Sequence, residues 1–110
     1  MRQSSGVLPS AQSLQRDCSY WMQQLVEAWK HGEWPQCLSL AQKITADFPE
    51  EGLAWKLLGS LYQQQNDLTL AVQAFSQAGK LLKKDAEVFY NLANVHAQLQ
   101  EHAQAIKHYR

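Results

Sequence analysis

The chain has 110 residues, and its ten Lys and Arg residues balance ten Asp and Glu residues to a formal net charge of zero at pH 7. This length suits one small domain, and the lack of a basic excess argues against nucleic acid or an anionic membrane as a partner held mainly by charge. Fifteen Leu, 15 Gln and 13 Ala, against nine Val, Ile and Thr together, predict an all-α protein.

Neither a membrane anchor nor a secretion signal is apparent in the sequence. No apolar run approaches the roughly 18–20 residues that cross a bilayer. The first residues also lack the apolar stretch of about 7–15 residues that is found in a signal peptide. Two Cys residues are too few for a disulfide scaffold. These features predict a cytoplasmic protein that works without a membrane partner.

The chain is expected to begin with a short leader. Residues 1–9 are polar and include Gly and Pro, which predicts a flexible segment ahead of a domain over residues 10–110. From Leu14 to Ala28, apolar residues recur every three or four positions, which indicates an amphipathic helix. This helix is predicted to start near residue 10 and to cap the leading end of the domain.

Turn and cap residues divide the rest of the chain into further helices. Gly32 and the Asn66-Asp67 pair are turn signals. Pro35 is tolerated only in the first turn of a helix, and Asp67 and Asp85 are expected to cap the helices that follow them. The six predicted helices span about residues 10–31, 34–47, 50–64, 67–82, 86–99 and 101–110.

Five columns of residues recur at a spacing of 34 without a gap. A fixed period of this kind indicates a repeat protein, in which each unit buries its apolar face by stacking on its neighbours. The units are residues 18–51, 52–85 and 86–110, the last of them incomplete. The columns are Trp21, Trp55 and Phe89; Gln24, Leu58 and Leu92; Leu25, Gly59 and Ala93; Cys37, Ala71 and Ala105; and Ala41, Phe75 and Tyr109.

The middle unit carries a distinctive motif, which reads W-x2-L-G-x2-Y from Trp55 and then A-x3-F-x2-A from Ala71. This motif resembles the signature of the tetratricopeptide repeat, except that Lys83 stands where the signature has a Pro. The third unit keeps the pattern with His96 in place of the tyrosine, and the first unit diverges most. The resemblance covers residues 18–110.

The resemblance implies an all-α, right-handed solenoid of antiparallel helix pairs, with about 2.7 repeats in this chain. It also implies a module that binds a peptide or helix of a partner protein. The interface is either the concave groove, lined by the first helix of each pair, or the open C-terminal end of the array. The groove positions of the family fall on Met22, Val26, Trp29, Lys56, Ser60, Gln63, Tyr90, Asn91, Asn94 and Gln98.

Two ligand modes known in the family have little support in these residues. Met22, Val26 and Leu57 stand at positions where chaperone-tail binders carry a polar clamp for a carboxylate. Asn91 matches one rung of the asparagine ladder found in O-GlcNAc transferase-like proteins, and helix packing explains it equally well. The groove is therefore expected to be apolar at one end and rich in amides at the other.

The last unit stops nine residues short of its period. Either the chain is the start of a longer protein, or its open apolar face pairs with another chain, which would make it self-associate. An alternative function is an N-terminal recruiting segment of a larger enzyme. The stretch over residues 32–59 is similar in style to the leading repeats of bacterial glycosyltransferases and sulfotransferases.

No set of residues supports catalysis, a cofactor or a metal site. His96, His102 and His108 are six residues apart, rather than the three or four that put two ligands on one helix face. Cys37 is expected to be a buried packing residue, and its offset from Cys18 is too large for a disulfide. The chain itself is therefore predicted not to be an enzyme.

Overall fold

The structure is a computed structural model that describes residues 17–108, with side chains up to residue 106. The predicted leader and residues 10–16 of the first predicted helix lie outside the described residues, as do residues 109–110. All regular secondary structure in the described range is helical. The helices are α2 (Cys18–Lys30), α3 (Trp34–Asp47), α4 (Gly52–Gln64), α5 (Leu68–Leu81) and α6 (Ala86–His108).

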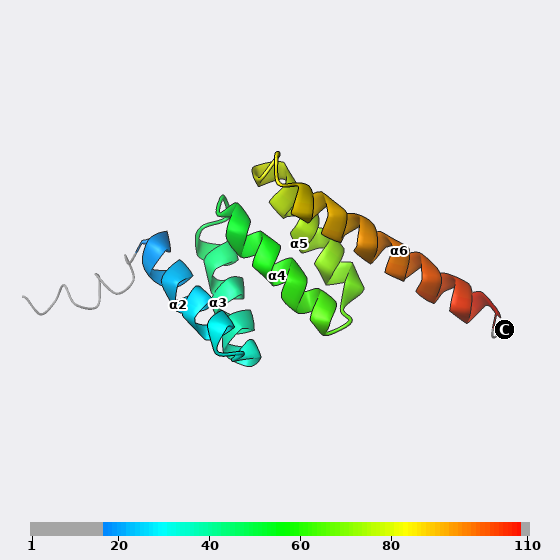
Figure 1. Ribbon diagram of the computed structural model, residues 1–110, viewed down its shortest axis with the longest axis horizontal. Helices are drawn as coiled ribbons and strands as arrows, with labels where there is room; N and C mark the ends of the chain where they lie inside the picture. The colour runs from blue at the N-terminus through cyan, green and yellow to red at the C-terminus, as the bar shows by residue number, and fades with distance from the viewer. Residues whose placement is uncertain (1–16, 109–110) are drawn as a thin grey trace, which may run out of the picture.

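The helices stack in chain order (Figure 1). α2 packs on α3 and α4 packs on α5 as antiparallel pairs, while α3 contacts α4 and α5 contacts α6. This is the arrangement of a helical repeat, in which each pair buries its apolar face against the next. The predicted all-α fold of helix pairs is confirmed, with two complete pairs in the described residues.

The turn inside each complete pair depends on one residue in the left-handed conformation. Gly32 has a φ of 67°, and Asn66, which lies one repeat later, has a φ of 62°. Glycine adopts this conformation without steric cost, and asparagine tolerates it better than most residues. Pro35 follows the first turn and lies in the first turn of α3, as predicted, where its missing N–H removes no helical hydrogen bond.

Carboxylates precede several helices. Asp85 accepts hydrogen bonds from two backbone N–H groups in the first turn of α6, at 3.0 and 3.3 Å, which confirms the predicted cap. Asp17 caps α2 in the same way by accepting from the N–H of Tyr20 at 3.1 Å. Asp67 occupies the cap position of α5, but its side chain forms no capping hydrogen bond with a described residue.

The prediction of two helices at the end of the chain, over 86–99 and 101–110, is wrong, because α6 passes through residue 100 without a break. Gln100 occupies the repeat position that Gly32 and Asn66 hold in the earlier units. Unlike those residues, glutamine is a good helix former and has no preference for the left-handed conformation. The third unit is therefore one long helix, within the described residues, rather than a helix pair.

Buried side chains form two clusters along the stack. The first joins α2, α3 and α4 around Leu25, Ile44 and Leu58, and the second joins α5 and α6 around Phe75. Small residues of the repeat columns allow the helices to approach closely. A Cβ atom added to Gly59 would lie 2.7 Å from Cδ1 of Phe75, so only glycine fits at this crossing.

Candidate functional site

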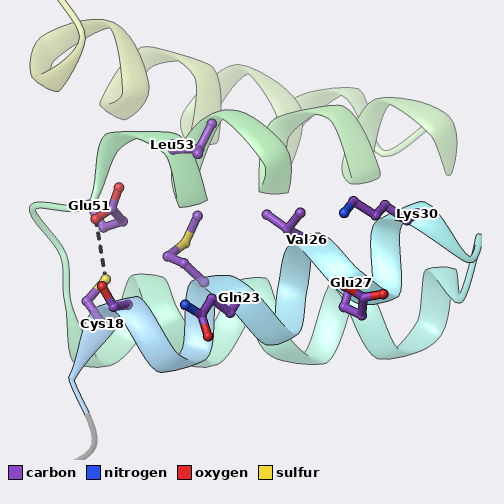
Figure 2. A pocket seen from close by; sticks show the side chains of 9 residues that line it. Cys18, Gln23, Val26, Glu27, Lys30, Glu51 and Leu53 are labelled. Carbon is purple, nitrogen blue, oxygen red and sulfur yellow. Dashed lines mark hydrogen bonds between the residues drawn. The ribbon is translucent and has the colours of Figure 1, made fainter.

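A groove lies between α2 and the beginning of α4, with a volume of about 540 Å³ (Figure 2). α2 and α4 are the first helices of neighbouring pairs, so the groove occupies the junction between the first two units. We call it the α2–α4 groove. It is lined by Cys18, Ser19, Met22, Gln23, Val26, Glu27, Lys30, Glu51 and Leu53.

The middle of the α2–α4 groove is apolar. Met22 and Val26 lie one turn apart on the same face of α2. Leu53 enters from α4 on the opposite wall, where Figure 2 shows it above α2. Val26 and Leu53 are each 39% exposed, which leaves apolar surface open to solvent on both walls. Such a surface favours binding of an apolar side chain, because binding removes that area from water.

One end of the groove is acidic. The thiol of Cys18 donates a hydrogen bond of 3.3 Å to Oε1 of Glu51, which joins the start of α2 to the cap residue of α4. Burial, this hydrogen bond and the charges of Glu51, Glu50 and Asp17 raise the pKa of Cys18 to about 11. Cys18 is therefore a neutral thiol near pH 7 and a poor nucleophile.

The other end of the groove carries a cation. Lys30 lies at the last turn of α2 and forms no ion pair with a described residue. The nearby Glu27 instead contacts Nε2 of His31 at 3.3 Å. The α2–α4 groove thus runs from a carboxylate cluster, past an apolar centre, to an amine.

The equivalent junction between α4 and α6 is bridged by polar contacts. Lys56, one repeat after Met22, contacts Asp85 at 2.9 Å and Glu87 at 2.6 Å. Farther along, the amide of Gln63 donates to Gln98 at 2.9 Å. Because these side chains satisfy one another, the second junction offers less unpaired surface than the first.

The ion pair of Lys56 should make stability sensitive to acid. Hydrogen bonding by Lys56, the first cause, and by backbone N–H groups lowers the pKa of Asp85 from its ordinary value of 3.8. A lowered pKa stabilises the fold above the pKa of the unfolded chain, and this contribution is lost as the pH falls through the lower, folded value. We expect Lys56→Met to lose less stability than wild type between about pH 5 and pH 2.

Urea unfolding at a series of pH values measures this difference. Lys43→Met is the matched control, since Lys43 forms an exposed pair with Asp47 at 3.0 Å within a single helix. The control should keep the pH profile of the wild-type chain. Parallel profiles for wild type and Lys56→Met would contradict the prediction.

The structure places the ten groove residues predicted from the sequence in several different surroundings. Met22 and Val26 line the α2–α4 groove. Trp29 packs half-buried against the first core cluster, with its ring edge-to-face on Trp34 at 5.3 Å between centroids. Lys56, Gln63 and Gln98 belong to the bridged second junction, and Ser60 lies half-buried on α4. The remaining three residues lie on α6, away from the groove: Tyr90, Asn91 and Asn94.

Three more lining residues, Ser19, Lys30 and Leu53, also fall on groove positions of the family. The other four were not predicted from the sequence: Cys18, Gln23, Glu27 and Glu51. A signal for one of them exists in the repeat register. Asp17, Glu51 and Asp85 are 34 residues apart and each precedes the first helix of a unit. A carboxylate that recurs at the start of successive helices predicts an acidic end for every groove of the array.

Among the described residues, no group of three or more His, Cys, Asp and Glu side chains is placed to hold a metal ion. Cys18 and Cys37 are both free thiols. No helix in the described range is long and apolar enough to cross a membrane.

Comparison with protein families identifies the middle part of the helical stack. Residues 59–100, which cover the end of α4, all of α5 and the first part of α6, match the family model described as TPR repeat. These residues carry the pattern of the tetratricopeptide repeat. A search of curated proteins finds no match. Tetratricopeptide repeats are in general non-catalytic modules for protein interaction. The α2–α4 groove lies between the first helices of the two complete helix pairs.

Proposed function

We propose that this chain binds a short, extended segment of a partner protein in the α2–α4 groove. The observation that carries the proposal is the contrast between the two junctions. The first has an open apolar centre, whereas Lys56 and Gln63 bridge the second with their own polar partners. An apolar groove with polar ends is the common form of a peptide site, because apolar contacts supply affinity and polar groups fix orientation.

The length and charges of the groove define the segment that fits it. From Cys18 to Lys30 the groove follows twelve residues of helix, or about 18 Å, which an extended peptide of about five or six residues spans. Its central side chains should be apolar, to cover Val26 and Leu53. Its ends should carry opposite charges, with a basic residue near Glu51 and an acidic residue near Lys30.

Labelled peptides test this chemistry directly. The first probe has a lysine at one end, leucines in the middle and an aspartate at the other end, and it is prepared in both chain directions. Two further probes carry lysine at both ends or aspartate at both ends. We expect one direction of the mixed-charge peptide to bind more tightly than either like-charged peptide in fluorescence anisotropy. Equal affinities would contradict the assigned polarity of the groove.

A charge placed on the apolar wall should weaken binding. We expect Leu53→Glu to weaken the best peptide at least about tenfold, because a carboxylate replaces apolar surface that the ligand would cover. Leu70→Glu is the matched control, since Leu70 lies on α5, outside the groove, and is 36% exposed against 39% for Leu53. Equal affinity for the two variants, with equal helicity, would place the peptide elsewhere.

A further inference from the structure

A second groove lies between α3 and α5, with α4 beneath it. Its volume is about 220 Å³, and its three helices all belong to the two complete pairs. We call it the α3–α5 groove. It is lined by Gln42 and Thr45 of α3, by Trp55, Leu58 and Tyr62 of α4, and by Leu70, Gln73 and Ala74 of α5.

The two grooves lie on opposite faces of α4. Leu53 lines the α2–α4 groove, and Tyr62, nine residues later, lines the α3–α5 groove. Nine residues at about 100° each turn a helix to about 180° from its starting direction. Trp55 lies seven residues before Tyr62, which places both on the same face. A peptide in one groove is therefore separated from the other by the width of α4, and the two sites can be tested separately.

Hydrogen bonds hold two aromatic rings at the α3–α5 groove. Nε1 of Trp55 donates to the carbonyl oxygen of Pro49 at 2.8 Å, and Nε2 of Gln42 donates to the hydroxyl oxygen of Tyr62 at 3.2 Å. Both rings are half-buried, and both pack on the first core cluster. The rings are thus in position before a ligand arrives, which lowers the entropy cost of binding.

The lining of the α3–α5 groove is neutral. None of its residues is charged, whereas Glu51 and Lys30 lie at the ends of the α2–α4 groove. Leu58 and Ala74 are buried and Leu70 is 36% exposed, so apolar surface lies between the polar groups. A charged ligand would lose hydration here without gaining an opposite charge. The groove therefore favours a neutral, largely apolar ligand.

Two polar groups of the groove are available to such a ligand. The hydroxyl oxygen of Tyr62 accepts from Gln42, and no described residue accepts from its O–H group in turn. The amide of Gln73 is exposed and forms no hydrogen bond within the described range. Both groups can donate, and backbone carbonyls are acceptors that every peptide offers.

The size of the groove and the spacing of its aromatic rings select the conformation of a bound peptide. Trp55 and Tyr62 are about 10.5 Å apart along the axis of α4. In a polyproline II helix, residues three positions apart share one side and are separated by about 9 Å. Residues on one side of a β-strand are instead about 7 or 13 Å apart. An α-helix is about 10–12 Å wide, which is too broad for this groove. The polyproline II conformation fits best.

We infer that the α3–α5 groove binds a proline-rich segment of a partner protein, with two prolines three positions apart packed against Trp55 and Tyr62. Proline supplies an apolar ring, favours the polyproline II conformation and has no N–H group that would need an acceptor. Carbonyls of the segment accept from Tyr62 and Gln73. Aromatic-lined grooves are a recurring way to recognise such segments. This site is separate from the α2–α4 groove and goes beyond the proposed function.

Fluorescence anisotropy with labelled, uncharged peptides tests the spacing. The first probe has the pattern P-x-x-P, with alanine and serine between and around the prolines. A second probe has one more alanine between the prolines, and a third has alanine in place of both. We expect the second and third probes to bind at least about fivefold more weakly, because only the first matches the two rings. Equal affinities of the first two probes, or no saturable binding of the first below about 1 mM, would overturn the inference.

Two variants of matched exposure decide which groove holds the P-x-x-P probe. We expect Leu70→Glu to weaken its binding at least about tenfold, because a carboxylate replaces apolar surface that the peptide covers. Leu53→Glu changes the α2–α4 groove instead and should bind the probe like wild type. Far-UV circular dichroism checks that both variants remain helical. An unchanged affinity in Leu70→Glu, or an equal loss in the two variants, would place the probe elsewhere and overturn the inference.

Tyr62→Phe tests the contact with the peptide backbone. The substitution removes the hydroxyl group and keeps the ring, so the P-x-x-P probe should bind about fivefold more weakly. An unchanged affinity would contradict the placement of the segment on Tyr62. The mixed-charge peptide of the α2–α4 groove should bind Leu70→Glu and Tyr62→Phe as it binds wild type, so the two proposals fail separately.

Discussion

Phe75→Ala is expected to lower the free energy of unfolding by about 3–5 kcal/mol, because the substitution leaves a cavity that the helices cannot close. Phe75 is the largest fully buried side chain among the described residues. It lies at the crossing of α4 and α5 and contributes to the cluster that holds α6. Domains of this size are stable by about 5–15 kcal/mol, so the loss removes a large part of the total. Urea unfolding followed by circular dichroism measures it.

A graded series keeps this prediction testable if the alanine variant does not fold. Phe75→Leu retains most of the buried volume and should cost about 1–2 kcal/mol. Leu70→Ala removes an apolar side chain that is 36% exposed on the same helix, and it should cost less than either. A Phe75→Ala variant as stable as Leu70→Ala would show that Phe75 does not anchor the crossing of α4 and α5.

Gly59→Ala is expected to destabilise the chain by about 1–3 kcal/mol, although alanine is the better helix former. The added Cβ would lie 2.7 Å from Cδ1 and 2.8 Å from Cε1 of Phe75. That ring is fully buried and cannot move aside without opening the core. The expected result is therefore a lower urea midpoint with the helical content unchanged.

Gly79→Ala is the matched control, because it makes the same change inside α5. Its Cβ would lie 3.1 Å from the ring of Phe89, which is 46% exposed and can move outward. The gain in helix propensity, about 0.5–1 kcal/mol, should then outweigh the steric cost of the added Cβ. This variant should therefore be at least as stable as wild type. Equal effects of the two substitutions would contradict the role assigned to the α4–α5 crossing.

The two junctions show how one repeat unit can present different surfaces. The same positions hold Met22 and Leu53 at the first junction and Lys56 and Glu87 at the second. The apolar pair leaves a groove, whereas the charged pair closes into a contact of 2.6 Å. Opposite charges attract across the gap between helices, while two apolar side chains gain little until a ligand excludes the water between them.

The helices and their repeat could be predicted from the sequence because their determinants are local or periodic. The spacing of 34 identified the units, and Pro35 and Asp85 marked helix starts that the structure reproduces. Left-handed Gly32 and Asn66 end the first helix of each complete pair, as their residue types indicate. The prediction failed at Gln100, where the period required a turn but the residue itself favours a helix.

The sequence by itself therefore determined the repeat, the helical class and most helix boundaries, since each follows from residue type and spacing along one chain. Only the tertiary structure decided which groove is open. That depends on contacts between residues about 30 positions apart, such as Lys56 with Asp85 or Cys18 with Glu51. It also placed Trp29 against the core rather than in the groove. A side chain's partner is fixed by how the helices stack, and this geometry is absent from any single repeat.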